Sequence, residues 1–306
     1  MPAMKTTLSE SKRKMLARRF AAQLAPECGN ILSRCRVESS GWFQMPQEFE
    51  DARIRLGVGD LYVSAYENEA RINLCAIKFL YPESTTQTIK EFEAEMQSAS
   101  DSELSDNIDG IEEALAGDEL VFDVFLPKTE RERDSAQKAF ESLAEAEQTA
   151  AITRTQYFLF FIYANFYNLL SVMIHGQKLT TLVPLAIQGD KEAFCKSVQI
   201  DRNLLTGHPY FKNTYARLLR GDDQDFLDRL LYRMGNPTTR SKIRFPTLYM
   251  VFATLESFQC LDEHTASEIL DICDTAQLDR FQNRIEDENN LIRRRRDYRN
   301  MQKLAK

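Results

Sequence analysis

Residues 189–194, GDKEAF, recur 32 residues later in the related form GDDQDF at residues 221–226. In both copies an apolar helical segment ends at the glycine, and a new one begins at the aspartate. Glycine after a helix and aspartate before the next one are the residue types that helix ends prefer. The two blocks therefore predict helical hairpins that follow one another along the chain, an architecture that presents surfaces to partners.

The spacing also assigns structural roles within the two blocks. Asp190 and Asp222 are expected to cap the second helix of each hairpin, because an aspartate oxygen accepts hydrogen bonds from the first free backbone N–H groups. Phe194 and Phe226 occupy the same place in the two blocks and are expected to anchor the hairpins in the core. These roles are structural, not catalytic.

Two related blocks are fewer than the three that a stable repeat array usually needs. The segments Phe245–Cys260 and Thr265–Asp274 could form a third, diverged hairpin. A repeat-like helical array and a non-repetitive helical bundle are therefore both kept as interpretations of the C-terminal part.

Composition limits the class of protein. With 43% hydrophobic and 28% charged residues, the chain of 306 residues is typical of a globular protein of two domains or one large domain. Its net charge of −7 argues against non-specific binding to nucleic acid or anionic membranes, unless a local basic patch overrides the sum. The six cysteines are dispersed without a CxxC pair, which predicts free thiols in the cytoplasm.

Residues 1–128 are predicted to form a small α+β domain. The segments Leu61–Tyr66 and Arg71–Tyr81 alternate in polarity as strands do, and a third strand is expected at Glu119–Leu126. Helices are expected at Ser9–Leu24, Ser84–Gln97 and Ser102–Leu115.

From residue 129 onward every expected element is helical, so the fold class is mainly α. No proline or glycine interrupts Thr129–Ile174, which allows one long helix connecting the N-terminal domain to the rest, in a segment taken as 129–178. A helical-hairpin array or bundle with a basic terminal helix is expected over 179–306. Its expected helices are Thr180–Gln188, Asp190–Gln199, Tyr210–Arg220, Asp222–Met234, Phe245–Cys260, Thr265–Asp274 and Arg284–Leu304.

The segment Thr155–Ile174 carries no charge and is long enough to span a bilayer. On a helical projection, six polar residues of the segment and its two ends form one stripe, and the remaining surface is mainly apolar. This stripe consists of Arg154, Tyr157, Asn165, Asn168, Ser171 and His175. The preferred interpretation is a buried core helix whose stripe meets a partner helix, a second subunit or a polar network. A membrane span, with the stripe lining an oligomeric pore, and a ligand-lining helix are the alternatives.

A cluster of arginines marks the C-terminal helix: Arg293, Arg294, Arg295, Arg296 and Arg299. Acidic residues precede the cluster, and this order suits the helix dipole, so a solvated terminal helix is the default interpretation. Contact with nucleic acid, another anion or an acidic protein is the alternative. A second basic patch, Arg240, Lys242 and Arg244, lies in the linker before Phe245 and could join the arginine cluster in space.

No cofactor and no metal site are expected. Cys260, His264 and Cys273 are spaced suggestively, but a structural zinc site needs a fourth ligand, so the two cysteines are assigned to the core and the histidine to the surface. The acidic residues around Asp118 and Asp123, with the nearby Lys128 and Glu119, could serve a metal-dependent nuclease, although an exposed strand face explains them more simply.

The sequence therefore favours a cytoplasmic, non-catalytic subunit that binds a protein partner or associates with itself. A membrane-associated effector or channel subunit using residues 155–174 is the second hypothesis. A metal-dependent nuclease with its site in the N-terminal part is the third.

Overall fold

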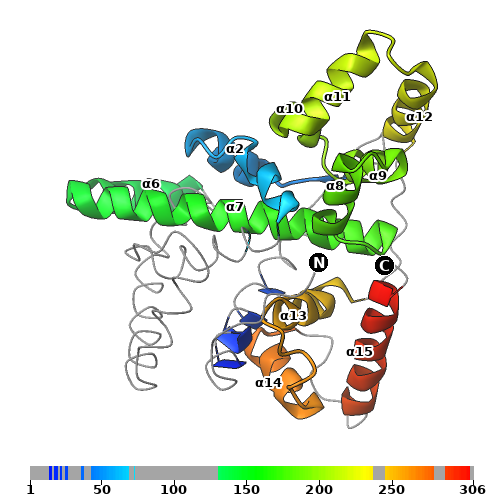
Figure 1. Cartoon of the computed structure of the whole chain (residues 1–306). Coiled ribbons are helices and arrows are strands. Elements are labelled where there is room, and N and C mark those ends of the chain that lie inside the picture. Colours follow the sequence, from blue (N-terminus) through cyan, green and yellow to red (C-terminus); the bar gives the residue numbers. More distant parts are fainter. Residues whose placement is uncertain are drawn as a thin grey trace, which may run out of the picture. The chain divides into compact units, whose positions relative to one another are not determined.

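The chain is mainly helical, as its sequence predicts (Figure 1). The computed structural model describes parts of 14–26, residues 36–37, 43–68, 72, 130–236, 245–278 and 287–303. Contacts divide the chain into two compact units. The first contains Pro46–Gly59 and Ala70–Phe161, and the second contains Arg13–Met45, Asp60–Glu69 and Ile162–Lys306.

The first unit contains α2 (Gln47–Arg55), α6 (Glu130–Glu141) and the first half of α7 (Glu145–His175). Helix α2 ends at Arg55, and the turn after it contains Gly57, whose φ of 67° lies in the left-handed region that glycine adopts without a steric penalty. The side-chain Nε2 of Gln156 in α7 donates a hydrogen bond of 2.6 Å to the carbonyl oxygen of Leu56. The end of α2 is thereby attached to α7 within this unit.

The expected single helix over Thr129–Ile174 is two helices, α6 and α7, separated at residues 142–144. The hydroxyl of Ser142 donates to the carbonyl oxygen of Ala139 at 2.6 Å, and the carboxylate of Glu147 accepts from the backbone N–H of Ala144 at 3.0 Å. These side chains satisfy backbone groups that would otherwise continue the helix. A break can therefore form without proline or glycine.

The prediction of a strand at Leu61–Tyr66 is wrong, because the segment forms the 3₁₀ helix η1 (Leu61–Glu67). Its buried residues are Tyr62, Val63, Ala65 and Tyr66. Three residues per turn place 62 above 65 and 63 above 66, so the buried face has a 3₁₀ period, not the alternation of a strand.

The small N-terminal α+β domain is not supported. Among the described residues, the only strands are β1 (Arg36–Val37) and β2 (Phe43–Gln44), which pair antiparallel. The expected strand Glu119–Leu126 and the helices expected at residues 84–97 and 102–115 lie outside the described residues. So does the expected strand at 71–81 except Ile72, which is helical.

The second unit contains the predicted hairpins. Their helices are α8 (Leu179–Ile187), α9 (Lys191–Ile200), α10 (Leu204–Gly207), α11 (Pro209–Leu219) and α12 (Gln224–Gly235). The two hairpins turn in the same way: Gly189 and Gly221 have φ of 102° and 94°, and the next N–H bonds back to the carbonyl five residues earlier. Figure 1 shows α11 running to such a turn and α12 returning from it.

The helix caps agree with the prediction in only one of the two hairpins. Asp190 caps α9, since its carboxylate accepts from the N–H groups of Glu192 and Ala193 at 2.8 and 3.0 Å. The expected cap at Asp222 is wrong: Asp223 caps α12, and Asp222 instead pairs with Arg217 at 2.9 Å. The second turn is one residue longer than the first, so the cap position moves by one.

Aromatic side chains hold the two hairpins together. Phe194 and Phe226 are both buried and meet edge to face with ring centroids 5.4 Å apart, and Phe194 also stacks on Phe211 at 4.4 Å. Lys191 pairs with Asp223, which links the starts of α9 and α12. The phenylalanines therefore act as the core anchors that the sequence predicts.

The remaining helices are α13 (Pro246–Ser257), α14 (Ala266–Thr275) and α15 (Asp287–Lys303). Thr265 and Glu268 form a reciprocal capping box at the start of α14. The described residues between 14 and 26 are helical, and Ala17, Ala21 and Ala25 are fully buried. Because these alanines recur every four residues, they lie on one helix face.

Candidate functional site

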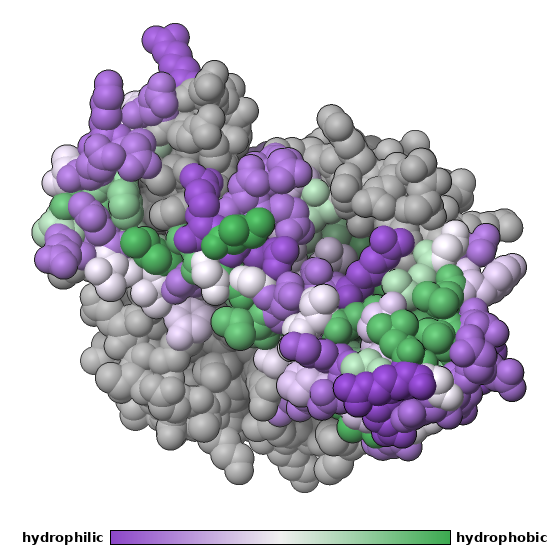
Figure 2. Space-filling model, turned by 90° about the horizontal axis from the view of Figure 1, so that it is seen from above, coloured by the Kyte–Doolittle hydropathy of each residue, from purple (hydrophilic) through white to green (hydrophobic). Residues whose placement is uncertain are grey.

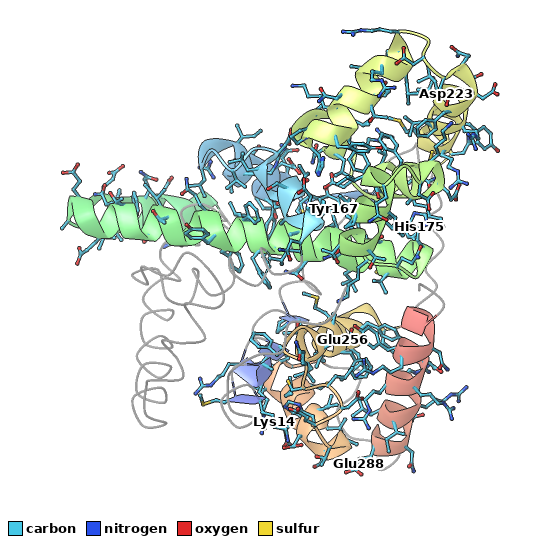
Figure 3. The ribbon with its side chains drawn as sticks, viewed as in Figure 1. Lys14, Tyr167, His175, Asp223, Glu256 and Glu288 are labelled. Carbon is cyan, nitrogen blue, oxygen red and sulfur yellow. The ribbon has the colours of Figure 1, made fainter. Side chains whose placement is uncertain are left out.

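The stripe of polar residues on α7 is largely buried. Asn168 and Ser171 are buried, whereas Tyr157, Asn165 and His175 are partly exposed, and the side chain of Arg154 lies outside the described part. Figure 3 shows Tyr167 and His175 projecting from the C-terminal half of α7. The stripe therefore contains both buried and partly exposed side chains.

Asn168 has a specific structural role. Helix α8 starts after Lys178, which provides no side-chain cap, and Asn168 Oδ1 accepts from the backbone N–H of Thr180 at 3.2 Å. A residue of α7 thus satisfies an N–H group at the beginning of α8. Ser171 differs, because its hydroxyl is fully buried and has no hydrogen-bond partner among the residues that the structure describes.

A second buried polar group lies where η1 meets the hairpins. Tyr66 donates its hydroxyl proton to Asp201 Oδ2 at 3.0 Å, and the backbone N–H of Asn203 donates to Oδ1 of the same aspartate at 3.0 Å. The side-chain Nδ2 of Asn203 donates to the hydroxyl oxygen of Tyr62 at 2.7 Å. Tyr62 also stacks on Tyr167 of α7, with centroids 6.1 Å apart and the rings inclined by 10°.

The electrostatics of this group are dominated by burial. Burial raises the pKa of the Asp201 carboxyl from 3.8 to about 7, while hydrogen bonds from Asn203, Tyr62 and Tyr66 act in the opposite direction. The pKa values of Tyr62 and Tyr66 are raised well above 10, first by burial and then by the nearby Asp201. The tyrosines therefore act as neutral hydrogen-bond partners.

Further contacts extend the junction at both ends of η1. Asp60 accepts from the Thr206 hydroxyl at 2.8 Å, and a Cβ atom placed on Gly207 would lie 2.3 Å from the Asp60 Cβ. At the other end, Nε2 of the buried His208 lies 3.0 Å from Glu67 Oε1, although neither ring nitrogen has a well-aligned hydrogen bond. We call the contacts of residues 60–67 with residues 201–208 the η1 clasp.

Sequence analysis missed the η1 clasp. The two sides of the clasp, residues 60–67 and residues 201–208, lie more than a hundred residues apart in the sequence. In addition, the polarity pattern of residues 61–66 predicts a strand. The one local signal is the pair Tyr62 and Tyr66, because an i, i+4 aromatic pair next to Val63 and Ala65 fits a helical face as well as it fits alternation.

The arginines of α15 divide into two groups. Arg295 donates to the carbonyl oxygen of His264 at 2.9 Å, Arg299 pairs with Glu256 at 2.6 Å, and Arg294 lies over the ring of Phe245 at 4.9 Å. Arg293 and Arg296 are exposed, and the linker patch at 240, 242 and 244 lies outside the described residues. The five arginines are thus not brought together on one open surface.

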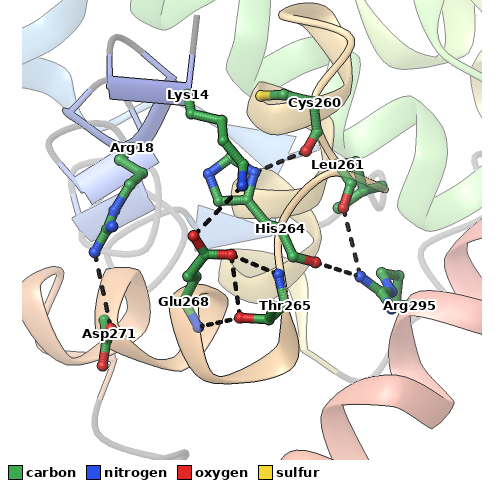
Figure 4. A network of polar contacts seen from close by, with 9 residues as sticks. All are labelled: Lys14, Arg18, Cys260, Leu261, His264, Thr265, Glu268, Asp271 and Arg295. Atoms are coloured by element: carbon green, nitrogen blue, oxygen red, sulfur yellow. Dashed lines mark hydrogen bonds and ion pairs between the residues drawn. The ribbon is translucent and has the colours of Figure 1, made fainter. Parts of the chain in front are cut away.

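The residues near the start of α14 form a connected polar network, drawn in Figure 4. Lys14 pairs with Glu268 at 3.4 Å, and Arg18 with Asp271 at 3.8 Å, so the N-terminal helical segment is attached to α14. Within α14 and the turn before it, the capping box of Thr265 and Glu268 anchors the network. These partly exposed pairs orient the segment more than they stabilise it.

Cys260, His264 and Cys273 have no metal-site arrangement. His264 is buried, not at the surface as expected, and its Nδ1 lies 2.7 Å from the carbonyl oxygen of Cys260. Burial raises the pKa of the Cys273 thiol to about 12, which makes it a poor metal ligand and a poor nucleophile. Among the described residues, no group of three or more histidine, cysteine, aspartate or glutamate side chains could hold a metal ion.

The residues of the nuclease hypothesis, Asp118, Glu119, Asp123 and Lys128, lie outside the described residues. Comparison with protein-family models, with curated proteins and with solved structures found no match.

Proposed function

We propose that this chain is a non-catalytic subunit that binds another protein, or a second copy of itself, through the outer surface of α8–α12. The observation that carries this proposal is a set of large apolar side chains left exposed on these helices: Ile187, Leu219, Leu231 and Tyr232. Tyr232 is 70% exposed and Leu219 is 60% exposed. Covering such side chains releases free energy, and tyrosine is enriched among the residues that dominate interfaces.

The surroundings of these side chains suit binding. On the face of the molecule that Figure 2 draws, apolar side chains lie in patches among hydrophilic ones. Protein interfaces commonly combine an apolar centre with a polar rim. The aromatic contacts of Phe194 and the ion pair between Arg233 and Glu192, at 2.7 Å, fix α9 against α12. A surface fixed in advance loses less conformational entropy on binding.

The test is a comparison of two variants. Leu231→Ser with Tyr232→Ser removes the apolar surface of α12, and Ile54→Ser removes an equally exposed apolar side chain from α2, where Ile54 is 67% exposed. We expect sedimentation velocity across a concentration series, together with quantitative co-purification, to show an association lost only in the α12 variant. Unchanged association in that variant, with the helical circular dichroism signal intact, would contradict the proposal.

The second candidate, a membrane-associated subunit, rests on α7. Among the described residues, its segment Glu147–His175 is the one helix long and apolar enough to cross a membrane, and its most apolar window of 18 residues has a mean hydropathy of 1.5. However, 78% of its most apolar window is buried by the rest of the chain, which favours a core helix. We therefore propose that α7 is a core helix of a cytoplasmic protein, and flotation with liposomes in the absence of detergent would contradict this proposal.

A further inference from the structure

The η1 clasp places one carboxyl group in a neighbourhood that suits its neutral form. The groups around Asp201 are Tyr62, Tyr66 and Asp60 from the η1 side, Asn203 at the start of α10, and, further out, Tyr167 of α7, which stacks on Tyr62. None of these five neighbours is a cation, and Asp60 repels a negative charge on Asp201. The adjacent residue, Arg202, has an exposed side chain.

The clasped state is therefore more stable with Asp201 protonated than with Asp201 ionised. With η1 in place, Asp201 is shielded from water, and its ionisation costs free energy. The hydrogen bonds from Asn203, Tyr62 and Tyr66 offset this cost only in part. If η1 moves away, Tyr62 and Tyr66 leave with it and water reaches the carboxylate. Proton binding and η1 binding must then favour each other, because linkage is reciprocal.

We propose that η1 is a detachable clasp, and that its attachment to residues 201–208 is coupled to a proton on Asp201, so that mild acidity fastens it and alkalinity loosens it. Residues 60–69 lie in the sequence between two segments, Pro46–Gly59 and Ala70–Phe161, that belong to the other unit. Loosening the clasp would release η1 from residues 201–208.

The pH range follows from the two states of Asp201. In the clasped state burial raises its pKa to about 7, and in the open, hydrated state the pKa returns towards 3.8. Between these values the open state binds fewer protons, so the open population increases with pH by up to about tenfold per pH unit, and it levels off above about 7.

His208 acts in the opposite direction. Burial lowers its pKa below 6.5 in the clasped state, so protonation on acidification favours opening, while the nearby Glu67 opposes this effect. The effects of Asp201 and His208 on the pH dependence of opening can be separated, because they have opposite signs. In addition, a substitution that removes the Asp201 charge leaves His208 unchanged.

Hydrogen exchange measured by mass spectrometry on the full chain tests the proposal. We expect the protection factor of residues 60–68, corrected for intrinsic exchange, to fall by roughly tenfold or more between pH 5.5 and 7.5, while residues 191–200 of α9 keep theirs. In Asp201→Asn the fall should vanish or reverse, leaving only the His208 effect. The matched control is Asp228→Asn, an exposed position on α12 that should retain the wild-type profile.

Tyr66→Phe provides an independent variant. Removing the donor to Asp201 Oδ2 should raise the pKa of Asp201 further and shift the loss of protection to higher pH. The proposal is overturned if wild-type protection at residues 60–68 is constant with pH. It is also overturned if Asp201→Asn keeps the wild-type slope, or if residues 191–200 lose protection in parallel, because the whole unit would then be opening.

Discussion

Two substitutions on the buried side of α7 should change stability in opposite directions, although both remove a polar group. Asn168→Leu keeps the branched shape of the side chain but removes the oxygen that accepts from Thr180. Ser171→Ala removes a fully buried hydroxyl for which the described part of the chain offers no hydrogen-bond partner. The sign of each effect depends on whether the polar group is paired, not on how polar it is.

The magnitudes follow from the contacts. Leaving the Thr180 N–H unpaired costs about 1–3 kcal/mol, and because Thr180 is only partly buried, water recovers some of this. A net loss of about 1 kcal/mol is expected for Asn168→Leu. For Ser171→Ala, the relief of an unpaired buried hydroxyl and the better helix propensity of alanine outweigh the lost volume, and about 1 kcal/mol of stabilisation is expected.

Thermal and urea denaturation, followed by far-UV circular dichroism, provide the measurement. Each change corresponds to a shift of roughly 2–4 °C in Tm, downward for Asn168→Leu and upward for Ser171→Ala. Destabilisation by Ser171→Ala would show that its hydroxyl is paired in solution. Stabilisation by Asn168→Leu would refute the role of Asn168 as the cap of α8.

Three further changes test the fold by the same denaturation assays. Gly207→Ala should destabilise by about 1–3 kcal/mol, because the added Cβ has no room beside Asp60, and a neutral result would mean that this close approach is absent. Asp223→Ala should lower Tm more than Asp222→Ala, because Asp223 caps α12 whereas Asp222 forms an exposed ion pair with Arg217, and equal losses would contradict the cap assignment. Gln277→Gly should stabilise by about 0.5 kcal/mol, because the exposed Gln277 has a φ of 50° that glycine adopts without strain, and a loss of stability would argue against this turn.

The local features of the C-terminal helices could be predicted from the sequence because their determinants lie within a few residues. The glycines at 189 and 221 mark two helix ends, and the spacing of Phe194 and Phe226 marks their buried faces. The sequence pattern does not predict the cap at Asp223, because either of two adjacent aspartates could cap the helix. Only the length of the turn before the helix distinguishes them.

The features that join distant segments could not be predicted in this way. Asp201 in the sequence is one aspartate in a loop, and nothing near it indicates that Tyr66 is its partner. The pattern of Leu61–Tyr66 predicts a strand instead of the 3₁₀ helix η1, because a stretch of six residues is short enough to fit both the strand period and the helical period. The break between α6 and α7 was missed because it depends on the side-chain hydrogen bonds of Ser142 and Glu147.

The long separation between the partners of the η1 clasp has a consequence for synthesis on the ribosome. Tyr66 emerges 135 residues before Asp201, and at about 5–20 residues per second the wait lasts roughly seven to thirty seconds. During that time Tyr66 lacks the carboxylate that accepts its hydroxyl proton, whereas the hairpins that supply it close locally and quickly once made. The η1 clasp therefore cannot form until residues 201–208 have been made, and a chain truncated before residue 201 should leave Tyr66 without this partner and open to chaperones.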